Sequence, residues 1–257
     1  MKLQTRISKL RIGVLILGLT CTSWGLAQDA DSNTELPSVD SIFERYVEAT
    51  GGAEAYQSRV SDIARGTMEI RAAGLVGQLE ISTRPGLQYT RIELPNVGVI
   101  ESGVKDGVAW ESNPLTGPRL LAGSEAEYTV LGARPDAPLH WHELYPDAQI
   151  IGIEEAGGEP AYRVAMMSGG LSMTNFFGID SGLLLKSLVE LDTQLGRVPI
   201  ELTIDDYTDF DGILTPSRTT MSQVGTQVVI TVSSVEANVD IPDERFVPPE
   251  AVQALLE

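Results

Sequence analysis

The chain has 257 residues, and its 36 Asp and Glu against 18 Lys and Arg give a net charge of −18 at pH 7. A field of this sign makes nucleic acid and anionic membrane surfaces poor partners, so we expect no nucleic-acid partner. Cys21 is the only cysteine, which excludes a disulfide within the chain and a cluster of thiolate metal ligands.

The first 27 residues have the pattern of a secretory signal peptide. Basic side chains precede an apolar run that begins at Ile12, and Ala27 suits cleavage after it. Gly18 and Thr20 stand where a lipoprotein signal needs other residues before its cysteine. We therefore expect a cleaved, unlipidated signal peptide over residues 1–27, a periplasmic or secreted protein, and no transmembrane span in the mature chain.

The rest of the chain reads as a short leader and one domain. Residues 28–36 are small and polar, which predicts a disordered leader, and no linker divides residues 37–257. Apolar residues then recur at helical spacing from Val39 to Val47, and Gly51 and Gly52 stop the run. This pattern predicts an amphipathic helix that covers whatever follows.

A period of two replaces the helical spacing after residue 62, which is typical of half-buried strands. The predicted strands are residues 62–72, 75–84, 87–94, 97–104, 108–112, 150–155, 161–167, 171–179, 183–191, 198–207, 213–222 and 227–235. Asp-Gly and Gly-Gly pairs at several of the connections are typical hairpin turns. Short links between successive strands predict an antiparallel meander.

A helical insert at about residues 123–147 interrupts the strands. Ser124 and Glu127 have the spacing of a capping box, and a second short helix is predicted over residues 138–145. We expect the insert to lie across one face of the sheet, where function often concentrates. The proline-rich tail from Ile241 to Pro249 predicts a closing strap.

The sequence His140-Trp141-His142-Glu143 is the strongest metal candidate, because two imidazoles and a carboxylate lie together. In a helix, however, residues two apart point about 200° apart. The zinc-protease pattern would also need a histidine where Pro146 stands. We expect a capped helix here and no metal site.

The acidic segment around Asp205 and Asp211 suggests a calcium loop, but Tyr207 and Arg218 would occupy the first and last ligand positions. No Gly-x-Ser-x-Gly nucleophile elbow, phosphate-binding loop or dinucleotide-binding motif occurs. We therefore expect no catalytic residue and no cofactor.

The succession of motifs resembles the LolA/LolB-like superfamily of outer-membrane lipoprotein-sorting proteins, which are periplasmic carriers. The segments that carry the resemblance are ATGGAEAY (49–56), the strand with Gly66, VKDGVAWE (104–111), FGIDSGLLLK (177–186), DDYTDFDGILTPSR (205–218) and IPDERFVPP (241–249). The resemblance implies an incomplete, strongly curved antiparallel barrel whose apolar concave face is covered by helices and holds acyl chains.

Pattern and resemblance together predict a mainly β protein with α-helices (α+β). In it, a curved antiparallel meander forms an incomplete β-barrel covered by the N-terminal helix and the mid-chain insert. The predicted function is that of a carrier, not an enzyme, for an acyl chain, a lipoprotein or another hydrophobic ligand. Its predicted ligand-lining residues are Trp110, Trp141, Tyr145, Met173 and Phe176.

Two alternatives stay open at this point. The first is an interaction module of the cell envelope, whose sheet edge or acidic surface docks a protein partner. The second is a hydrolase that uses paired carboxylates or the two histidines, because the pairing of carboxylates is spatial and is not visible in a sequence.

Overall fold

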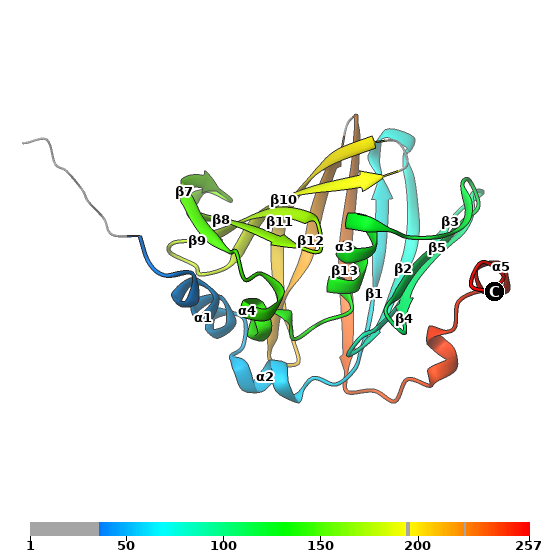
Figure 1. The fold of residues 1–257 in the computed structure, drawn as a ribbon, viewed down its shortest axis with the longest axis horizontal. Coiled ribbons are helices and arrows are strands. Elements are labelled where there is room, and N and C mark those ends of the chain that lie inside the picture. Colours follow the sequence, from blue (N-terminus) through cyan, green and yellow to red (C-terminus); the bar gives the residue numbers. More distant parts are fainter. Residues whose placement is uncertain (1–35, 194–195, 224) are drawn as a thin grey trace, which may run out of the picture. The chain divides into compact units, whose positions relative to one another are not determined.

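A computed structural model describes residues 36–257 except 194–195 and 224, and in these residues thirteen strands form one antiparallel sheet (Figure 1). The predicted signal peptide and residues 28–35 lie outside the described residues. The strands are β1 Asp62–Ile70, β2 Leu75–Arg84, β3 Leu87–Leu94, β4 Gly98–Lys105, β5 Val108–Asn113, β6 Gly117–Leu120, β7 Gln149–Ala156, β8 Glu159–Ser168, β9 Leu171–Gly178, β10 Leu184–Thr193, β11 Gly196–Phe210, β12 Ile213–Gln223 and β13 Thr226–Ala237.

The strand order is β6-β5-β4-β3-β2-β1-β13-β12-β11-β10-β9-β8-β7. Strands that follow each other in the chain are therefore neighbours, and the two meanders meet where Asp62 of β1 pairs with Ala237 of β13. We call β1–β6 the first wing and β7–β13 the second wing. Because β6 and β7 are both edges, the sheet is not closed, and the predicted incomplete barrel is confirmed.

Tight turns explain why the wings are built from hairpins. Asp106 and Asp211 have φ angles of 54° and 52° and each precedes a glycine that also has positive φ, as two-residue hairpin turns require. The predicted meander is confirmed, although the short edge strand β6 was not predicted, because Gly117 and Pro118 give it no alternating pattern.

Five α-helices and three short 3-10 helices lie among the described residues. They are α1 Val39–Ala49, α2 Ala53–Ser58, α3 Gly123–Gly132, α4 Trp141–Leu144 and α5 Glu250–Gln253, with 3-10 turns η1 Arg71–Ala73, η2 Ala137–His140 and η3 Asp243–Phe246. The predicted first helix is confirmed, and Ser38 caps it by accepting a hydrogen bond from the Ser41 amide at 3.2 Å.

Within the described part of the chain, no helix combines the length and apolar character needed to cross a membrane.

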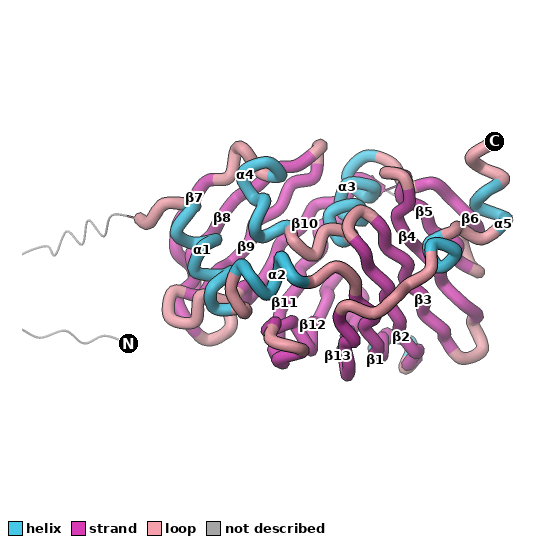
Figure 2. Tube along the Cα trace, turned by 90° about the horizontal axis from the view of Figure 1, so that it is seen from below, coloured by secondary structure: helices cyan, strands magenta, loops and turns pink. Residues whose placement is uncertain are grey.

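The insert connects the two edges of the sheet. The chain leaves the first wing at Leu120 and enters the second at Gln149, and α3 between them contacts β4 and β5 of one wing and β9 and β10 of the other. Figure 2 shows α3 between the wings and α1 and α4 beside the second wing. We call the face that these helices cover the inner face, and the opposite one the outer face.

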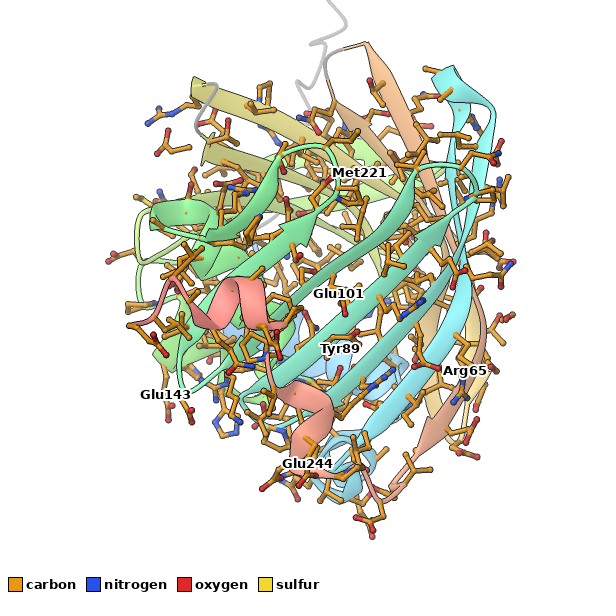
Figure 3. All side chains as sticks on the ribbon, turned by 90° about the vertical axis from the view of Figure 1, so that its right-hand side faces the viewer. Arg65, Tyr89, Glu101, Glu143, Met221 and Glu244 are labelled. Carbon is orange, nitrogen blue, oxygen red and sulfur yellow. The ribbon has the colours of Figure 1, made fainter. Side chains whose placement is uncertain are left out.

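The C-terminal strap packs on the outer face of the first wing. Ile241, Phe246 and Val252 form a buried cluster there with Tyr89 and Trp110. Figure 3 shows the strap crossing this face, on the same side as Tyr89 and Glu101, and the Tyr89 hydroxyl donates a hydrogen bond of 2.5 Å to the Glu101 carboxylate. The protein's own tail therefore covers part of this face.

Candidate functional site

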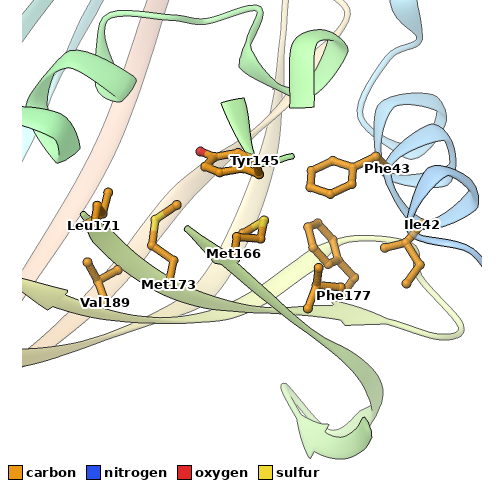
Figure 4. Packing of buried hydrophobic residues seen from close by; sticks show 9 residues of the cluster. Ile42, Phe43, Tyr145, Met166, Leu171, Met173, Phe177 and Val189 are labelled. Carbon is orange, nitrogen blue, oxygen red and sulfur yellow. The ribbon is translucent and has the colours of Figure 1, made fainter. Parts of the chain in front are cut away.

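The inner face of the second wing is filled by aromatic side chains from the helices. Phe43 of α1 stacks on Trp141 of α4 with ring centroids 4.9 Å apart and meets Phe177 of β9 edge-on at 5.3 Å. Figure 4 shows Tyr145 and Phe43 lying over Met166 and Phe177. All of these side chains except Trp141 are buried, so this region is packed core.

Helix α3 is attached to the first wing by an ion pair and by backbone contacts. Arg119 of β6 pairs with Glu125 at 2.8 Å and with Glu111 of β5 at 3.4 Å. At the other end of α3, the Gln88 side chain donates to the Gly132 carbonyl oxygen at 2.8 Å. Both ends of the helix are thus fixed to strands of one wing.

The same helix is attached to the second wing by the two residues of the predicted capping box. Ser124 does not cap α3, whose N-cap is Ala122, but accepts a hydrogen bond from the Asp192 amide at 2.6 Å. Glu127 accepts one of 2.5 Å from the Ser168 hydroxyl. The predicted capping box is therefore wrong, because Ser124 lies inside the helix, and the two residues join the wings instead.

The inner face of the first wing carries an apolar surface that we call the open strip. Its members are Leu79, Ile92 and Leu94, which are buried, and Met68, Ile70, Leu75, Ile81, Val97, Ile100 and Ile230, which are partly buried. Every described member comes from β1–β4, from β13 or from the turn before β4, and none from a helix. The strip therefore has no helical cover of the kind seen in the second wing.

Strand register places the open strip on the inner face. Residues two apart on a strand share a face, so Ile100 and Val104 of β4 point the same way. Val104 packs with Ala133 at the end of α3. Ile92 pairs with Ile100, and Leu79 pairs with Ile92, so the strip runs across three strands beside α3.

Tyr128 of α3 is 38% exposed, and desolvation raises the pKa of its phenol. Tyr145 lies near it, and burial, followed by the Glu127 charge, raises the pKa of Tyr145 to about 12.

A hollow that we call the basal pocket lies on the inner face at the end of the sheet next to α2. It has a volume of about 260 Å³. Its walls come from the helices, the insert and the central strands: Tyr46, Tyr56, Arg59, Asp62, Ala64, Thr83, Pro135, Pro138, Ile213, Leu214, Thr215, Pro216 and Val235. Most of these walls are apolar, and Arg59 and Asp62 are the charged exceptions.

Tyrosines crowd together at the basal pocket. Burial, followed by the charges of Tyr56 and Tyr207, raises the pKa of Tyr46 well above its ordinary value. Burial also raises the pKa of Tyr207, whose hydroxyl donates to the Leu184 carbonyl oxygen at 2.7 Å. All three phenols are therefore neutral at physiological pH and serve as hydrogen-bonding groups.

The structure brings together three of the five predicted ligand-lining residues. Trp141, Tyr145 and Met173 meet in the packed core of the second wing. Phe176 lies on the outer face with Leu185, and Trp110 lies under the C-terminal strap. These two residues therefore lie apart from the other three. Phe176 points to the face opposite Met173 because the two are an odd number of residues apart on one strand.

Sequence reasoning did not single out the open strip, Tyr128 or Arg59. The alternation of Met68, Ile70, Leu79 and Ile81 gave the faces of the strands correctly. Which apolar face stays without a helix depends on where the insert crosses, and no local pattern encodes that. Arg59 carried no motif signal, because its role depends on a pocket formed by distant segments.

Each of the two histidines contacts a different carboxylate, so the two imidazoles do not share one site. His142 Nε2 lies 2.8 Å from Asp40 of α1, and His140 Nε2 lies 3.2 Å from Asp136. Within the described ranges, no group of three or more His, Cys, Asp or Glu side chains is arranged to hold a metal ion. The Asp205 carboxylate accepts a hydrogen bond from the Thr220 hydroxyl, and the Asp209 carboxylate accepts one from the Gly212 amide. Such contacts are typical of a strand end and of a turn.

Two solved structures share this architecture over nearly their whole length. A LolA superfamily protein from Nitrosomonas europaea is 16% identical, with a TM-score of 0.57, and the match covers 83% of this chain and 99% of that one. A DUF1329 family protein from Desulfovibrio piger is also 16% identical, with a TM-score of 0.56 and coverage of 82% and 98%.

No family model matches the chain, and no curated protein matches it. At 16% identity the structural likeness concerns the fold alone. The resemblance predicted from the sequence is thereby confirmed at that level: this chain has the fold of LolA superfamily proteins.

Proposed function

We propose that this protein is a non-enzymatic carrier or binding protein that holds an acyl chain or another hydrophobic ligand against the open strip, beside α3. The observation that carries the proposal is an apolar inner face of ten residues without helical cover in the described chain. An uncovered apolar surface of this size is typical of a ligand site.

The energetics support an apolar ligand. Each methylene removed from water contributes roughly 0.8 kcal/mol, so a long acyl chain gains enough to bind even after its ordering cost. No charged side chain belongs to the open strip, so affinity there depends on burial alone.

The fold and the leader support a place in the cell envelope. The sequence resembles periplasmic lipoprotein-sorting carriers, and its first residues have the pattern of a cleaved signal peptide. We therefore propose a periplasmic or secreted carrier, whose ligand includes the acyl chains of lipids or lipoproteins and which docks an envelope partner to deliver them.

A matched pair of neighbouring residues tests the site. Leu75 belongs to the open strip, whereas Val76 beside it is 50% exposed and pairs with Glu69 on the outer face. Saturable uptake of a fluorescent fatty acid should weaken about tenfold in Leu75→Gln. The Val76→Gln variant should bind like the unmodified protein.

Native mass spectrometry gives an independent measurement. Protein exported to a bacterial envelope and purified without detergent should carry a bound lipid in a stoichiometric amount. Finding neither a bound lipid nor saturable uptake of the fluorescent fatty acid would show that the protein is not a carrier of this kind.

A further inference from the structure

The basal pocket contains one arginine, Arg59, and its side chain is less exposed than that of any other arginine in the ion pairs of the described residues. The Arg59 side chain is only 9% exposed, and its Nε donates to the Asp62 carboxylate. Among the described residues, its two Nη groups make no hydrogen bond, although the side chain lines the pocket. A guanidinium presents these groups as a fork that suits a carboxylate or a phosphate.

Other arginines of the chain show what such a fork accepts here. Arg119 contacts both Glu111 and Glu125. Arg65 contacts both Glu80 and Glu236. Two carboxylates around one guanidinium is thus a repeated arrangement in this acidic protein, whereas several other arginines, Arg59 among them, contact one carboxylate.

The hydroxyl groups beside Arg59 are already occupied. The Thr50 hydroxyl donates to the Tyr46 carbonyl oxygen at 2.7 Å, and the Tyr56 and Thr50 hydroxyls are 2.7 Å apart. Because Thr50 has used its proton, Tyr56 is the donor in the second bond. Among the side chains that line the pocket, that of Arg59 is the one with a positive charge.

The basal pocket continues into the open strip along single strands. On β2, Thr83 lines the pocket while Ile81, Leu79 and Leu75 follow on the same face in the strip. At about 3.3 Å per residue, Thr83 and Leu75 are about 26 Å apart along the strand. An extended acyl chain that lies on the strip can thus end at Arg59.

We propose that the basal pocket takes the anionic head group, a carboxylate or a phosphate, of a ligand whose chain lies on the open strip, with Arg59 as its charge partner. This inference rests on the proposed carrier function and specifies its ligand class: single-headed anionic amphiphiles. The Asp62 carboxylate holds the guanidinium through Nε, and the two Nη groups make no hydrogen bond among the described residues.

The test compares two ligands that differ only in head-group charge. Palmitate and methyl palmitate are titrated by displacement of a fluorescent fatty acid from the unmodified protein, Arg59→Gln and Arg59→Lys. We expect palmitate to bind about ten- to a hundredfold more tightly than its ester, because a hydrogen-bonded charge pair replaces a neutral contact. Arg59→Gln should remove this preference while ester binding persists, and Arg59→Lys should keep part of it.

Two further variants keep the experiment decisive. Arg71→Gln removes an exposed arginine at the opposite end of β1 and should leave the preference unchanged. If Arg59→Gln is unstable because Asp62 is left without its partner, the double variant Arg59→Gln/Asp62→Asn removes the lone buried charge. The preference should be absent in that variant too.

The outcomes separate this inference from the carrier function. Equal binding of palmitate and methyl palmitate by the unmodified protein overturns the head-group site and leaves the carrier standing. If Arg59→Gln weakens binding of palmitate and of methyl palmitate by the same factor, so that the preference is retained, Arg59 has a structural role and the head-group site is also overturned. Failure of the unmodified protein to bind either ligand overturns the carrier function itself.

Discussion

The inner faces of the two wings are both apolar, but the helices cover them to different extents. In the second wing, Phe43 and Trp141 from the helices lie on Phe177 of the sheet and fill the space. The apolar cluster of the open strip, nine residues of the first wing and Ile230 of β13, includes no described helical residue. The same kind of surface thus serves as core in one wing and as a candidate ligand site in the other.

This difference teaches that the insert, and not the sheet, decides which apolar face is covered. Helix α3 is attached to both wings, through Arg119 on one side and through Ser124 and Glu127 on the other. It therefore joins the wings without adding an apolar side chain to the cluster of the open strip. The comparison predicts that substitutions in the second wing change stability, whereas substitutions in the first wing change ligand binding.

The largest expected effect is on the free energy of unfolding when the covered core loses an aromatic ring. Phe177 is 2% exposed and contacts Phe43 and Tyr46, so Phe177→Ala should cost about 3–5 kcal/mol in urea unfolding. Ile81→Ala in the open strip should cost only about 1 kcal/mol. Equal losses of unfolding free energy in the two variants would mean that the open strip is ordinary packed core.

A smaller loss is expected when the roof of the second wing is loosened. Trp141 is half-buried and stacks on Phe43, so Trp141→Ala should lower the free energy of unfolding by about 2 kcal/mol. His142→Ala is the control, because its contact with Asp40 is exposed and contributes about 1 kcal/mol or less. A larger loss for His142→Ala than for Trp141→Ala would contradict packing as the cause.

The hydrogen bond that attaches Ser124 of α3 to the second wing should contribute about 1 kcal/mol to the free energy of unfolding. Ser124 is 3% exposed and accepts from the Asp192 amide, so Ser124→Ala removes that bond. Hydrogen exchange of the α3 amides should become faster, and the fluorescent fatty acid should be released faster. Thr129→Ala, which breaks a bond inside α3, should not change ligand release.

The smallest expected effect depends on pH and concerns the turn on which α1 rests. Burial opposes ionisation of Glu159, but hydrogen bonds from Ser181 and the Asp180 amide outweigh it and lower the pKa of its carboxyl. A lowered folded pKa contributes stability above the unfolded pKa, which is lost as pH falls through the folded pKa.

Glu159→Gln should therefore lower the free energy of unfolding at pH 7 by about 1 kcal/mol or less. The difference from the unmodified protein should close at pH 3, which urea unfolding at both pH values measures. Glu155→Gln, at an exposed position of β7, should show no pH-dependent difference. A gap that widens in acid would contradict the sign of this pKa shift.

Most of the sheet could be predicted from the sequence, because each strand carries its own signal. The strand over Leu87–Leu94 was predicted with its observed bounds, and Asp-Gly turns marked the hairpins correctly. Helix α2 was not predicted, because its six residues contain too few turns to show a helical period. Local patterns thus suffice where pairing is local.

The candidate site was harder to predict, because it is formed by segments that are far apart in the chain. Aromatic residues such as Trp110 and Phe176 were expected to line a ligand, but the structure places both on the outer face. Phe176 could have been excluded by counting strand positions from Met173. Arg59 could not have been found, since only the folded chain brings it beside Pro138 and Val235.

The pairing of β1 with β13 has a consequence for folding order. All other ladders join strands that follow each other in the chain, so each wing can form hairpin by hairpin at a low entropic cost. The ladder that pairs Met68 with Ile230 is the one long-range step in the sheet, and both residues belong to the open strip. We therefore expect the ability to bind a ligand to appear late in folding and in a single step, when the two preformed wings pair through β1 and β13.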